Sequence, residues 1–326
     1  MKRPDWFLLG LGAAVLLAWL VPEPGARGGS LHPELLNKLG VALIFLLHGL
    51  TLPLAALISG ARKWRVHLFV QLATFVLFPL LGLALLTILS PSVGAELRTG
   101  LFFLCALPST VSSSVALTGA ARGDVPVALF NATLSSLLGV VLTPLWLGIG
   151  LGAAGQSLPF WPVVLELLRW LVLPLVVGQL LRPWLAELAS RHRARIALVD
   201  RVTILLIVYT SFCDFVLGGA GGRAAASLLL IGAVCGLLLA VALASTWAGG
   251  RLLGFERAER IAALFCGSKK SLAAGVPMAR VIFGAGPSLA LVLVPIMLYH
   301  SLQLVVGAWL AARLARATED QAAGVS

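Results

Sequence analysis

The sequence predicts an all-α integral membrane protein with ten transmembrane helices, arranged as two inverted repeats of five helices. Three observations support this fold class. Of the 326 residues, 60% are hydrophobic and only 11% are charged, whereas soluble domains carry about 25% charged residues. The apolar residues form stretches of roughly 17–27 residues, the length that crosses a hydrocarbon core of ~30 Å. The basic residues lie between these stretches and mostly on one side.

The ten expected spans follow one another with short loops. They are 6–22, 36–59, 66–89, 97–121, 125–150, 159–181, 196–217, 224–250, 258–283 and 287–313. Lys2 and Arg3 precede the first span as in a signal peptide, but no small-residue cleavage site follows it, so we expect a retained span. The segment 150–157, GLGAAGQS, is a predicted loop and divides repeat 1–155 from repeat 156–326.

The loop charges predict the orientation. On one side lie Lys2, Arg3, Arg62, Lys63, Arg65, Arg122, Arg182, Arg191, Arg193, Arg195, Arg251, Arg257, Arg260, Arg313 and Arg316, and on the other Arg27, Arg98 and Arg223. Because cytoplasmic loops carry the excess of Lys and Arg, both termini are predicted to be cytoplasmic, in a bacterial inner membrane. The net charge of +11 forms no single patch, so it does not indicate nucleic acid.

Two spans contain polar interruptions. The ninth holds adjacent lysines, Lys269 and Lys270, within GSKKS. A lysine at the centre of a membrane helix costs about 2.5–3.5 kcal/mol on insertion scales, so we expect a broken helix lining a polar cavity. The fourth is interrupted at PSTVSSS, residues 108–114. Paired interruptions at matching places in two halves indicate inverted repeats and a binding site between them.

The candidate binding residues come from these interruptions and from the fifth span. They are Lys269, Lys270, Ser268, Ser271, Ser109, Thr110, Ser112, Ser113, Ser114, Asn131, Thr133 and Ser135. Each also has a structural interpretation. Hydroxyl groups in membrane helices often serve only interhelical contacts, and the lysines could extend towards the cytoplasmic interface.

Secondary candidates are three further polar residues in the predicted spans. Asp214 could be a gate partner or solute contact opposite the lysines, or it could lie at the membrane interface. His300 could be a pH-sensitive neighbour of the site, and Gln71 a further polar contact. The four cysteines all fall within spans, and we expect them to be reduced core residues.

The chain resembles the bile acid:sodium symporter superfamily, specifically the branch of the seventh member of solute carrier family 10. The matching segments are LPSTVSSSVALT at 107–118, ALFN at 128–131, LTP at 142–144, FCGSKKSL at 265–272, GVPM at 275–278 and PIMLYH at 295–300. The resemblance implies a core of spans three to five and eight to ten, in which spans four and nine cross. Spans one, two, six and seven would form a panel, and solute would pass between core and panel by alternating access.

The chain also departs from sodium-coupled members of that superfamily. They place a glutamate and a glutamine in the broken ninth span, where this chain has Phe265 and Lys269. Their asparagine of the fourth span is replaced by serines 112–114. A sodium site is expected to have oxygen ligands that include compensating negative charge. Our hypothesis is that the ammonium of Lys269 or Lys270 stands in for the sodium ion, and that the coupling ion is a proton rather than sodium.

The predicted function is secondary transport of a small organic anion, because two lysines and helix N-termini meet at the breaks. The alternative is a cation/proton exchanger or a regulator of cation (calcium) flux, which the missing carboxylate pair disfavours. An enzyme is not expected, since G-x-S-x-G, P-loop and G-x-G-x-x-G motifs are absent from the sequence. We expect no cofactor, no metal site and no nucleic-acid partner.

Overall fold

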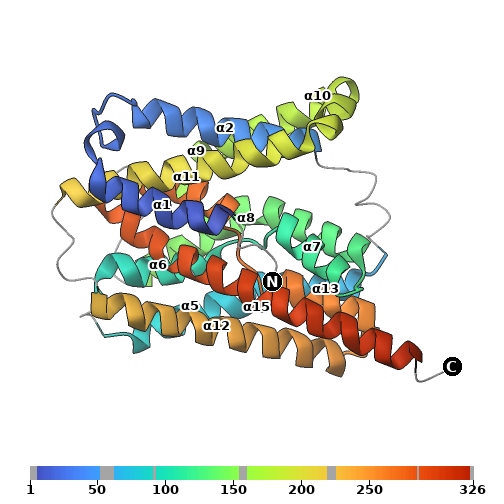
Figure 1. Ribbon diagram of the computed structural model, residues 1–326. Coiled ribbons are helices and arrows are strands. Elements are labelled where there is room, and N and C mark those ends of the chain that lie inside the picture. The colour runs from blue at the N-terminus through green and yellow to red at the C-terminus, as the bar shows by residue number, and fades with distance from the viewer. Residues whose placement is uncertain are drawn as a thin grey trace.

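The computed structural model describes residues 6–51, 62–90, 93–153, 160–218, 225–284 and 286–323, and all regular secondary structure in these ranges is helical (Figure 1). The first half contains α1 (Trp6–Leu20), η1 (Glu23–Gly25), α2 (Pro33–Thr51), α4 (Trp64–Leu72), η2 (Ala73–Leu77), α5 (Phe78–Ile88), α6 (Ala95–Ala106), α7 (Ser112–Ala120) and α8 (Val125–Ala153). The second contains α9 (Phe160–Leu167), η4 (Leu168–Val172), α10 (Leu173–Arg191), α11 (Arg193–Leu217), α12 (Ala225–Leu252), α13 (Arg257–Gly267), α14 (Leu272–Phe283) and α15 (Pro287–Ala323).

Seven helical stretches within the described residues are long and apolar enough to cross a membrane. They are Pro33–Thr51, Trp64–Ile88, Val125–Gly152, Trp161–Arg191, Arg193–Leu217, Leu228–Leu252 and Ser288–Arg316. The protein is therefore built as an all-helical membrane protein. The expected count was higher because α1 is a shorter apolar helix and because α6, α7, α13 and α14 have only 12, 9, 11 and 12 residues. Each of the two interrupted spans is thus a pair of short helices.

Some sequence expectations lie outside the described residues. These are the charges Lys2, Arg3 and Arg223, the part of the second expected span after Thr51, and residues 154–157 of the loop expected at 150–157. The expectation was wrong for residues 150–153, which are helical and form the end of α8.

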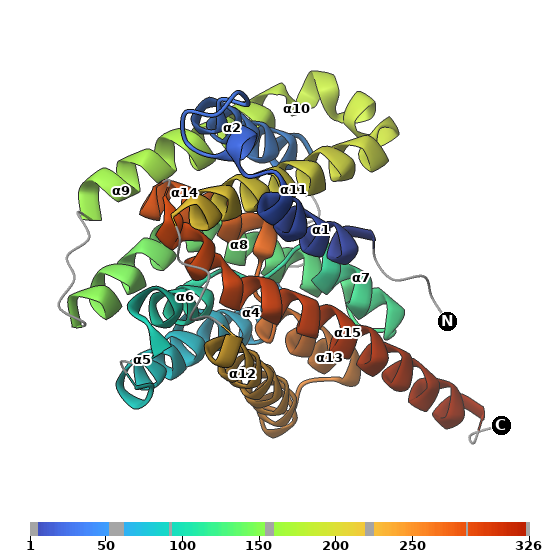
Figure 2. The same ribbon diagram turned by 60° about the vertical axis from the view of Figure 1, so that its left-hand side comes forward.

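The helices form two groups that lie on opposite sides of the molecule. Both views place α2, α9, α10 and α11 along one side and α5, α12 and α13 along the other (Figures 1 and 2). In the first group α2 packs along α10, and α1 packs along α11. In the second, α6 packs on α5 and α15, while α12 packs on α13 and α15. One continuous apolar cluster, with Phe102, Leu147, Ile207 and Ile296 among its buried members, fills the space between the helices.

The π-helical turn η2 interrupts the third span and exposes main-chain oxygens. Pro79 has no N–H to donate to the carbonyls of Thr74 and Phe75, five and four residues earlier. Both oxygens find other donors, since the Trp146 indole binds the Phe75 carbonyl at 2.8 Å and the Lys270 ammonium binds the Thr74 carbonyl at 2.9 Å. Pro79 thus leaves two main-chain carbonyls in the middle of the third span available to accept hydrogen bonds from other segments.

An ion-pair cluster joins the beginnings of three helices. The Lys63 ammonium, immediately before α4, lies 2.8 Å from Glu259 of α13 and 3.2 Å from Asp124, which precedes α8. Asp124 also accepts a hydrogen bond from the Val127 N–H at 3.0 Å and so caps α8. This cluster ties α4, α8 and α13 together at one end of the molecule.

Candidate functional site

The two interruptions, residues 107–111 between α6 and α7 and residues 268–271 between α13 and α14, contact one another at the centre of the molecule. One hydrogen bond joins the two segments directly, from the Ser271 N–H to the Pro108 carbonyl at 2.9 Å. Two more join the first interruption and the start of α7 to the end of α13: the Ser109 hydroxyl donates to the Cys266 carbonyl at 2.6 Å, and the Ser114 hydroxyl to the Phe265 carbonyl at 3.1 Å. These bonds satisfy main-chain groups that a continuous helix would have paired internally.

Local sequence explains why the helices stop here. Leu107 precedes a proline and is extended, with ψ of 153°, because the proline ring disfavours the helical conformation of the residue before it. On the other segment, the Ser271 side chain accepts a hydrogen bond from the Ala274 N–H at 3.1 Å and caps α14. The Ser268 hydroxyl donates back to the Leu264 carbonyl at 2.6 Å. The hydroxyls of Ser268 and Ser271 are therefore both hydrogen-bonded to main-chain groups at helix ends.

Lys270 has a fully buried side chain whose ammonium is surrounded by main-chain oxygens. It donates to the carbonyls of Thr74 at 2.9 Å, Cys105 at 2.8 Å and Leu107 at 2.7 Å. These three acceptors match the three N–H donors of an ammonium. Cys105 and Leu107 lie at the C-terminal end of α6, where the helix dipole favours a cation. The Phe78 ring, with its centroid 4.2 Å from the nitrogen, adds a cation–π contact.

Two side chains of α15 hold the second interruption. Gln303 accepts a hydrogen bond from the Lys270 N–H and donates one to the Lys270 carbonyl, both at 2.9 Å. Tyr299, one turn earlier, donates its hydroxyl hydrogen to the Ser268 carbonyl at 2.6 Å. Both main-chain groups of Lys270 are therefore satisfied by a single amide side chain.

Lys269 is as deeply buried as Lys270, with 1% of its surface exposed, but its surroundings are different. Its ammonium has no hydrogen-bond partner among the described residues, and its nearest aromatic ring, that of Phe265, has its centroid 5.8 Å away. Gly307 of α15 lies beside it, since a Cβ there would be in ordinary contact with the nitrogen at 3.9 Å, whereas it would lie only 2.7 Å from Leu117 Cδ1. A buried cation without a partner is costly, and such groups are candidates for function.

The hydroxyl cluster of the fourth span is only partly directed inwards. The Thr110 hydroxyl lies 2.7 Å from that of Ser113 and 2.9 Å from that of Ser114. Ser109 and Ser114 are fully buried, Ser113 is half-buried, and Ser112 is exposed at the start of α7. Ser112 is thus separated from the buried members of the cluster.

The α8 residues lie beside the first interruption. Ser135 accepts a hydrogen bond from the Ser109 N–H at 2.9 Å. The Asn131 side chain donates to the Val127 carbonyl at 3.0 Å and accepts from the Gln71 amide at 3.3 Å. The Gln71 amide also reaches the Asn131 carbonyl, at 3.1 Å, and so links α4 to α8. The hydroxyl of Thr133, a buried side chain, has no partner among the described residues.

The other two secondary candidates are placed differently. Asp214, near the end of α11, accepts a hydrogen bond at 2.8 Å from the main-chain N–H of Arg27 in the loop after η1. It also interacts electrostatically with Arg280 of α14. Asp214 therefore binds the main chain of Arg27 and interacts with the charge of Arg280. His300 of α15 is closer to the lysines, because its Nδ1 lies 3.0 Å from the Gln303 amide nitrogen that binds Lys270.

Sequence reasoning missed Gln303, Tyr299 and Arg280. Gln303 and Tyr299 lie four residues apart and so occupy the same face of α15 as one another. Two polar side chains at that spacing in an apolar span were the available signal. The four cysteines are free and buried, as predicted.

Comparison with known proteins identifies the family. Residues 5–316 match the model of the SBF-like CPA transporter family. The chain is 45% identical over 324 residues to a protein of Pseudomonas aeruginosa described as uncharacterized, covering 99% of this chain and 96% of that one. It is 35% identical to sodium/bile acid cotransporter 7 of Danio rerio, covering 94% and 92% of the two chains. The mouse protein of the same name is 34% identical, covering 94% and 91%.

These matches extend over nearly the whole chain. They confirm the predicted likeness to the bile acid:sodium symporter superfamily and to the branch of its seventh member. They also confirm that the chain is a transporter and not an enzyme, and the apolar helices make it a multi-pass membrane protein. The chain belongs to the SBF-like CPA transporter family.

Proposed function

We propose that this protein is a secondary active transporter that moves a small organic anion across the membrane by alternating access. In this proposal Lys270 is a built-in cation that replaces a coupling sodium ion, and Lys269 is the free cation that meets the solute. The observation that carries the proposal is the contrast between the two ammonium groups, of which one has three main-chain acceptors and the other has none among the described residues.

The carbonyl cluster around Lys270 supports the first role. Oxygen ligands from interrupted helices are the usual binders of coupling cations in transporters. Here the carbonyls of Thr74, Cys105 and Leu107 hold an ammonium that is covalently attached to the chain. A mobile sodium ion at this position would compete with a ligand that cannot leave. The proton, which can bind to or leave an amine, is the coupling ion that we favour.

Lys269 supports the choice of solute. A buried, unpaired ammonium attracts an anion, and the N-terminal ends of α7 and α14 add positive potential near the crossing. The hydroxyls of Thr110, Ser113 and Ser114, together with Thr133 and Ser135 of α8, would line the path. Relatives named sodium/bile acid cotransporter 7 suggest bile-acid-like organic anions among the compounds to test.

The architecture that we propose for alternating access has ten spans in two inverted repeats, 1–155 and 156–326. The core comprises α4–α8 and α12–α15, and the panel comprises α1, α2 and α9–α11. The separation of α2, α9, α10 and α11 from α5, α12 and α13 supports this division (Figures 1 and 2). We place the protein in a bacterial inner membrane with both termini on the cytoplasmic side, because Arg182, Arg191, Arg193 and other charges near the ends of the expected spans gather on that side.

The test uses purified protein and measures its unfolding temperature in sodium, potassium or choline chloride, with cholate, lactate and succinate as probe anions. A ligand that binds only the native state stabilises it by RT ln(1 + [L]/Kd). We expect sodium to raise the unfolding temperature no more than potassium or choline does. We expect at least one probe anion to raise it, and we expect Lys269→Gln to abolish that rise. Lys38→Gln is the control, since Lys38 is an exposed lysine over the Trp170 ring, 5.7 Å from its centroid.

Transport is then measured in sealed vesicles with the stabilising anion. Uptake should follow an imposed pH gradient and should not require sodium. Stabilisation by sodium alone would contradict the replacement of that ion by Lys270. An anion effect that survives Lys269→Gln would contradict the role of Lys269. Proton-driven movement of sodium, potassium or calcium without an organic anion would instead support cation exchange.

A further inference from the structure

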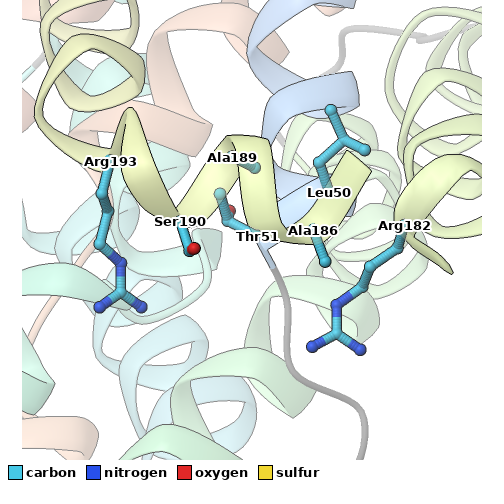
Figure 3. A pocket seen from close by; sticks show the side chains of 7 residues that line it. All are labelled: Leu50, Thr51, Arg182, Ala186, Ala189, Ser190 and Arg193. Atoms are coloured by element: carbon cyan, nitrogen blue, oxygen red, sulfur yellow. The ribbon is translucent and has the colours of Figure 1, made fainter. Parts of the chain in front are cut away.

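A pocket of about 200 Å³ lies between the end of α2 and the last turns of α10, away from the two interruptions. Its lining residues are Leu50, Thr51, Arg182, Ala186, Ala189, Ser190 and Arg193. Figure 3 shows Arg182 and Arg193 extending to the same side of α10, with Ala186 and Ser190 between them. The pocket is thus a recess with a guanidinium group at each end.

Neither arginine has a charge to balance it within the described residues. The nearest acidic side chain on α10, Glu187, is paired with Arg191 at 2.5 Å. The Nε of Arg182 is buried and has no hydrogen-bond partner among the described residues. An arginine presents a fork of N–H donors that matches a phosphate group. The recess therefore offers unpaired donors and two uncompensated positive charges.

The hydroxyl groups of the recess are acceptors rather than donors. The Thr51 hydroxyl donates its hydrogen to the Leu47 carbonyl at 2.9 Å, and the Ser190 hydroxyl donates to the Glu187 carbonyl at 2.8 Å. Their oxygens still have lone pairs free for hydrogen bonds from a ligand. A ligand that carries both a phosphate and hydroxyl groups would satisfy both kinds of side chain.

The recess lies at the level where membrane spans end. The candidate spans Pro33–Thr51 and Trp161–Arg191 both end beside it, and Arg193–Leu217 begins there. Trp184 of α10 is 76% exposed, as is usual for tryptophan at the membrane–water interface. Basic pockets between helices at this level bind the headgroups of anionic lipids.

We infer that this recess binds the headgroup of an anionic phospholipid, with its phosphate on Arg182 at one end, its glycerol hydroxyls on Thr51 and Ser190, and Arg193 adding positive charge at the other end. The inference is independent of the solute site, because none of these residues lies at the crossing of the two interrupted helices.

The test measures binding of phosphatidylglycerol, phosphatidylcholine and inorganic phosphate to delipidated, detergent-solubilised protein, by native mass spectrometry and by the unfolding temperature. We expect phosphatidylglycerol to bind and stabilise the wild type, and phosphatidylcholine to do so far less. The double variant Arg182→Gln/Arg193→Gln should lose affinity for phosphatidylglycerol by about tenfold or more. Arg195→Gln is the control variant. Arg195 follows Arg193 by two residues and carries the same charge, but its side chain does not line the recess.

Three outcomes would overturn the inference. One is equal binding of phosphatidylglycerol and phosphatidylcholine, and another is wild-type affinity in the double variant. The third is stabilisation by inorganic phosphate to which phosphatidylglycerol adds nothing, which would assign the recess to a soluble anion. If the double variant does not fold, Arg182→Lys/Arg193→Lys keeps the charges without the fork, and its affinity for phosphatidylglycerol should fall below that of the wild type.

Discussion

The side chain of Gln303 pairs with both main-chain groups of Lys270, accepting from its N–H and donating to its carbonyl at 2.9 Å each. A helix would have paired these groups internally, so the amide replaces the backbone partners that the interruption removes. The position of the Lys270 side chain follows from this clamp, because its main chain is held from α15 while its ammonium reaches α6 and the third span.

Replacing Gln303 by leucine should therefore destabilise the protein. Two buried main-chain groups would lose their partners, at about 1–3 kcal/mol for each. The measurement is the unfolding temperature in detergent. Ser301→Ala, on the same helix, serves as the control, and equal stability of Gln303→Leu and wild type would refute the clamp.

Removing the Lys270 side chain should create a cation-binding cavity. Lys270→Ala leaves the carbonyls of Thr74, Cys105 and Leu107 without their donor, and we expect a large loss of stability. Ammonium, methylammonium or sodium should restore part of it, by about 2.7 kcal/mol at a hundredfold excess over Kd. Lys270→Met fills the same space without a donor, so it should be destabilised and should not respond to cations. A response of the wild type equal to that of Lys270→Ala would contradict this account.

Lys269 should behave in the opposite way. Lys269→Met replaces an unpaired buried ammonium with an apolar side chain of similar length. Burying a polar group without a partner costs about 1–3 kcal/mol, so this variant should be at least as stable as the wild type. It should nevertheless lose the stabilisation by anions. Urea or thermal unfolding of the two methionine variants side by side provides the comparison, and a strong destabilisation by Lys269→Met would indicate a structural role.

The ion-pair cluster around Lys63 predicts a dependence on pH and salt. The hydrogen bond to Glu259, aided by Asp124, raises the pKa of Lys63 above its usual 10.5, although burial opposes this. A raised lysine pKa stabilises the fold fully below pH 10.5, and the contribution is lost as pH rises through the folded-state value. The Lys63 side chain is 39% exposed, so the contribution should be about 1 kcal/mol or less.

Lys63→Gln should therefore lower the unfolding temperature at neutral pH and low salt. The difference from wild type should shrink in about 1 M salt, where the Debye length is ~3 Å, and should vanish well above pH 10.5. Lys38→Gln again controls for the loss of one positive charge. A difference that is unchanged by both salt and high pH would mean that Lys63 acts through packing alone.

The sequence was most informative where charged or polar residues occur within a stretch that is otherwise apolar enough to cross a membrane. Lys269 and Lys270 in an apolar stretch, and Pro108 with the hydroxyls after it, predicted helix ends that the structure has at Gly267, Leu272, Ala106 and Ser112. The conflict is local, so it can be detected from the residues themselves.

Distances between segments could not be predicted in the same way. Which of two adjacent lysines has partners depends on how α15 and the third span pack against the interruption. Ser112 looked equivalent to Ser114, yet the phase of α7 leaves one exposed and the other buried. The acceptors of Lys270 are main-chain oxygens, which every residue carries, so no side-chain pattern could have indicated them.

The π-helical turn Ala73–Leu77 determines how this chain tolerates changes in its length. A π turn holds one more residue than an α turn, so deleting one residue there should convert it to α-helical spacing, with Pro79 still interrupting the hydrogen bonds, while α4 and α5 keep their neighbours. Such a deletion would change little of the third span's apolar surface, but it would shift the Thr74 oxygen away from Lys270. Substitutions at Thr74, Cys105 and Leu107 keep their carbonyls, whereas a one-residue gap in an alignment would mark a homologue that has lost one of these ligands.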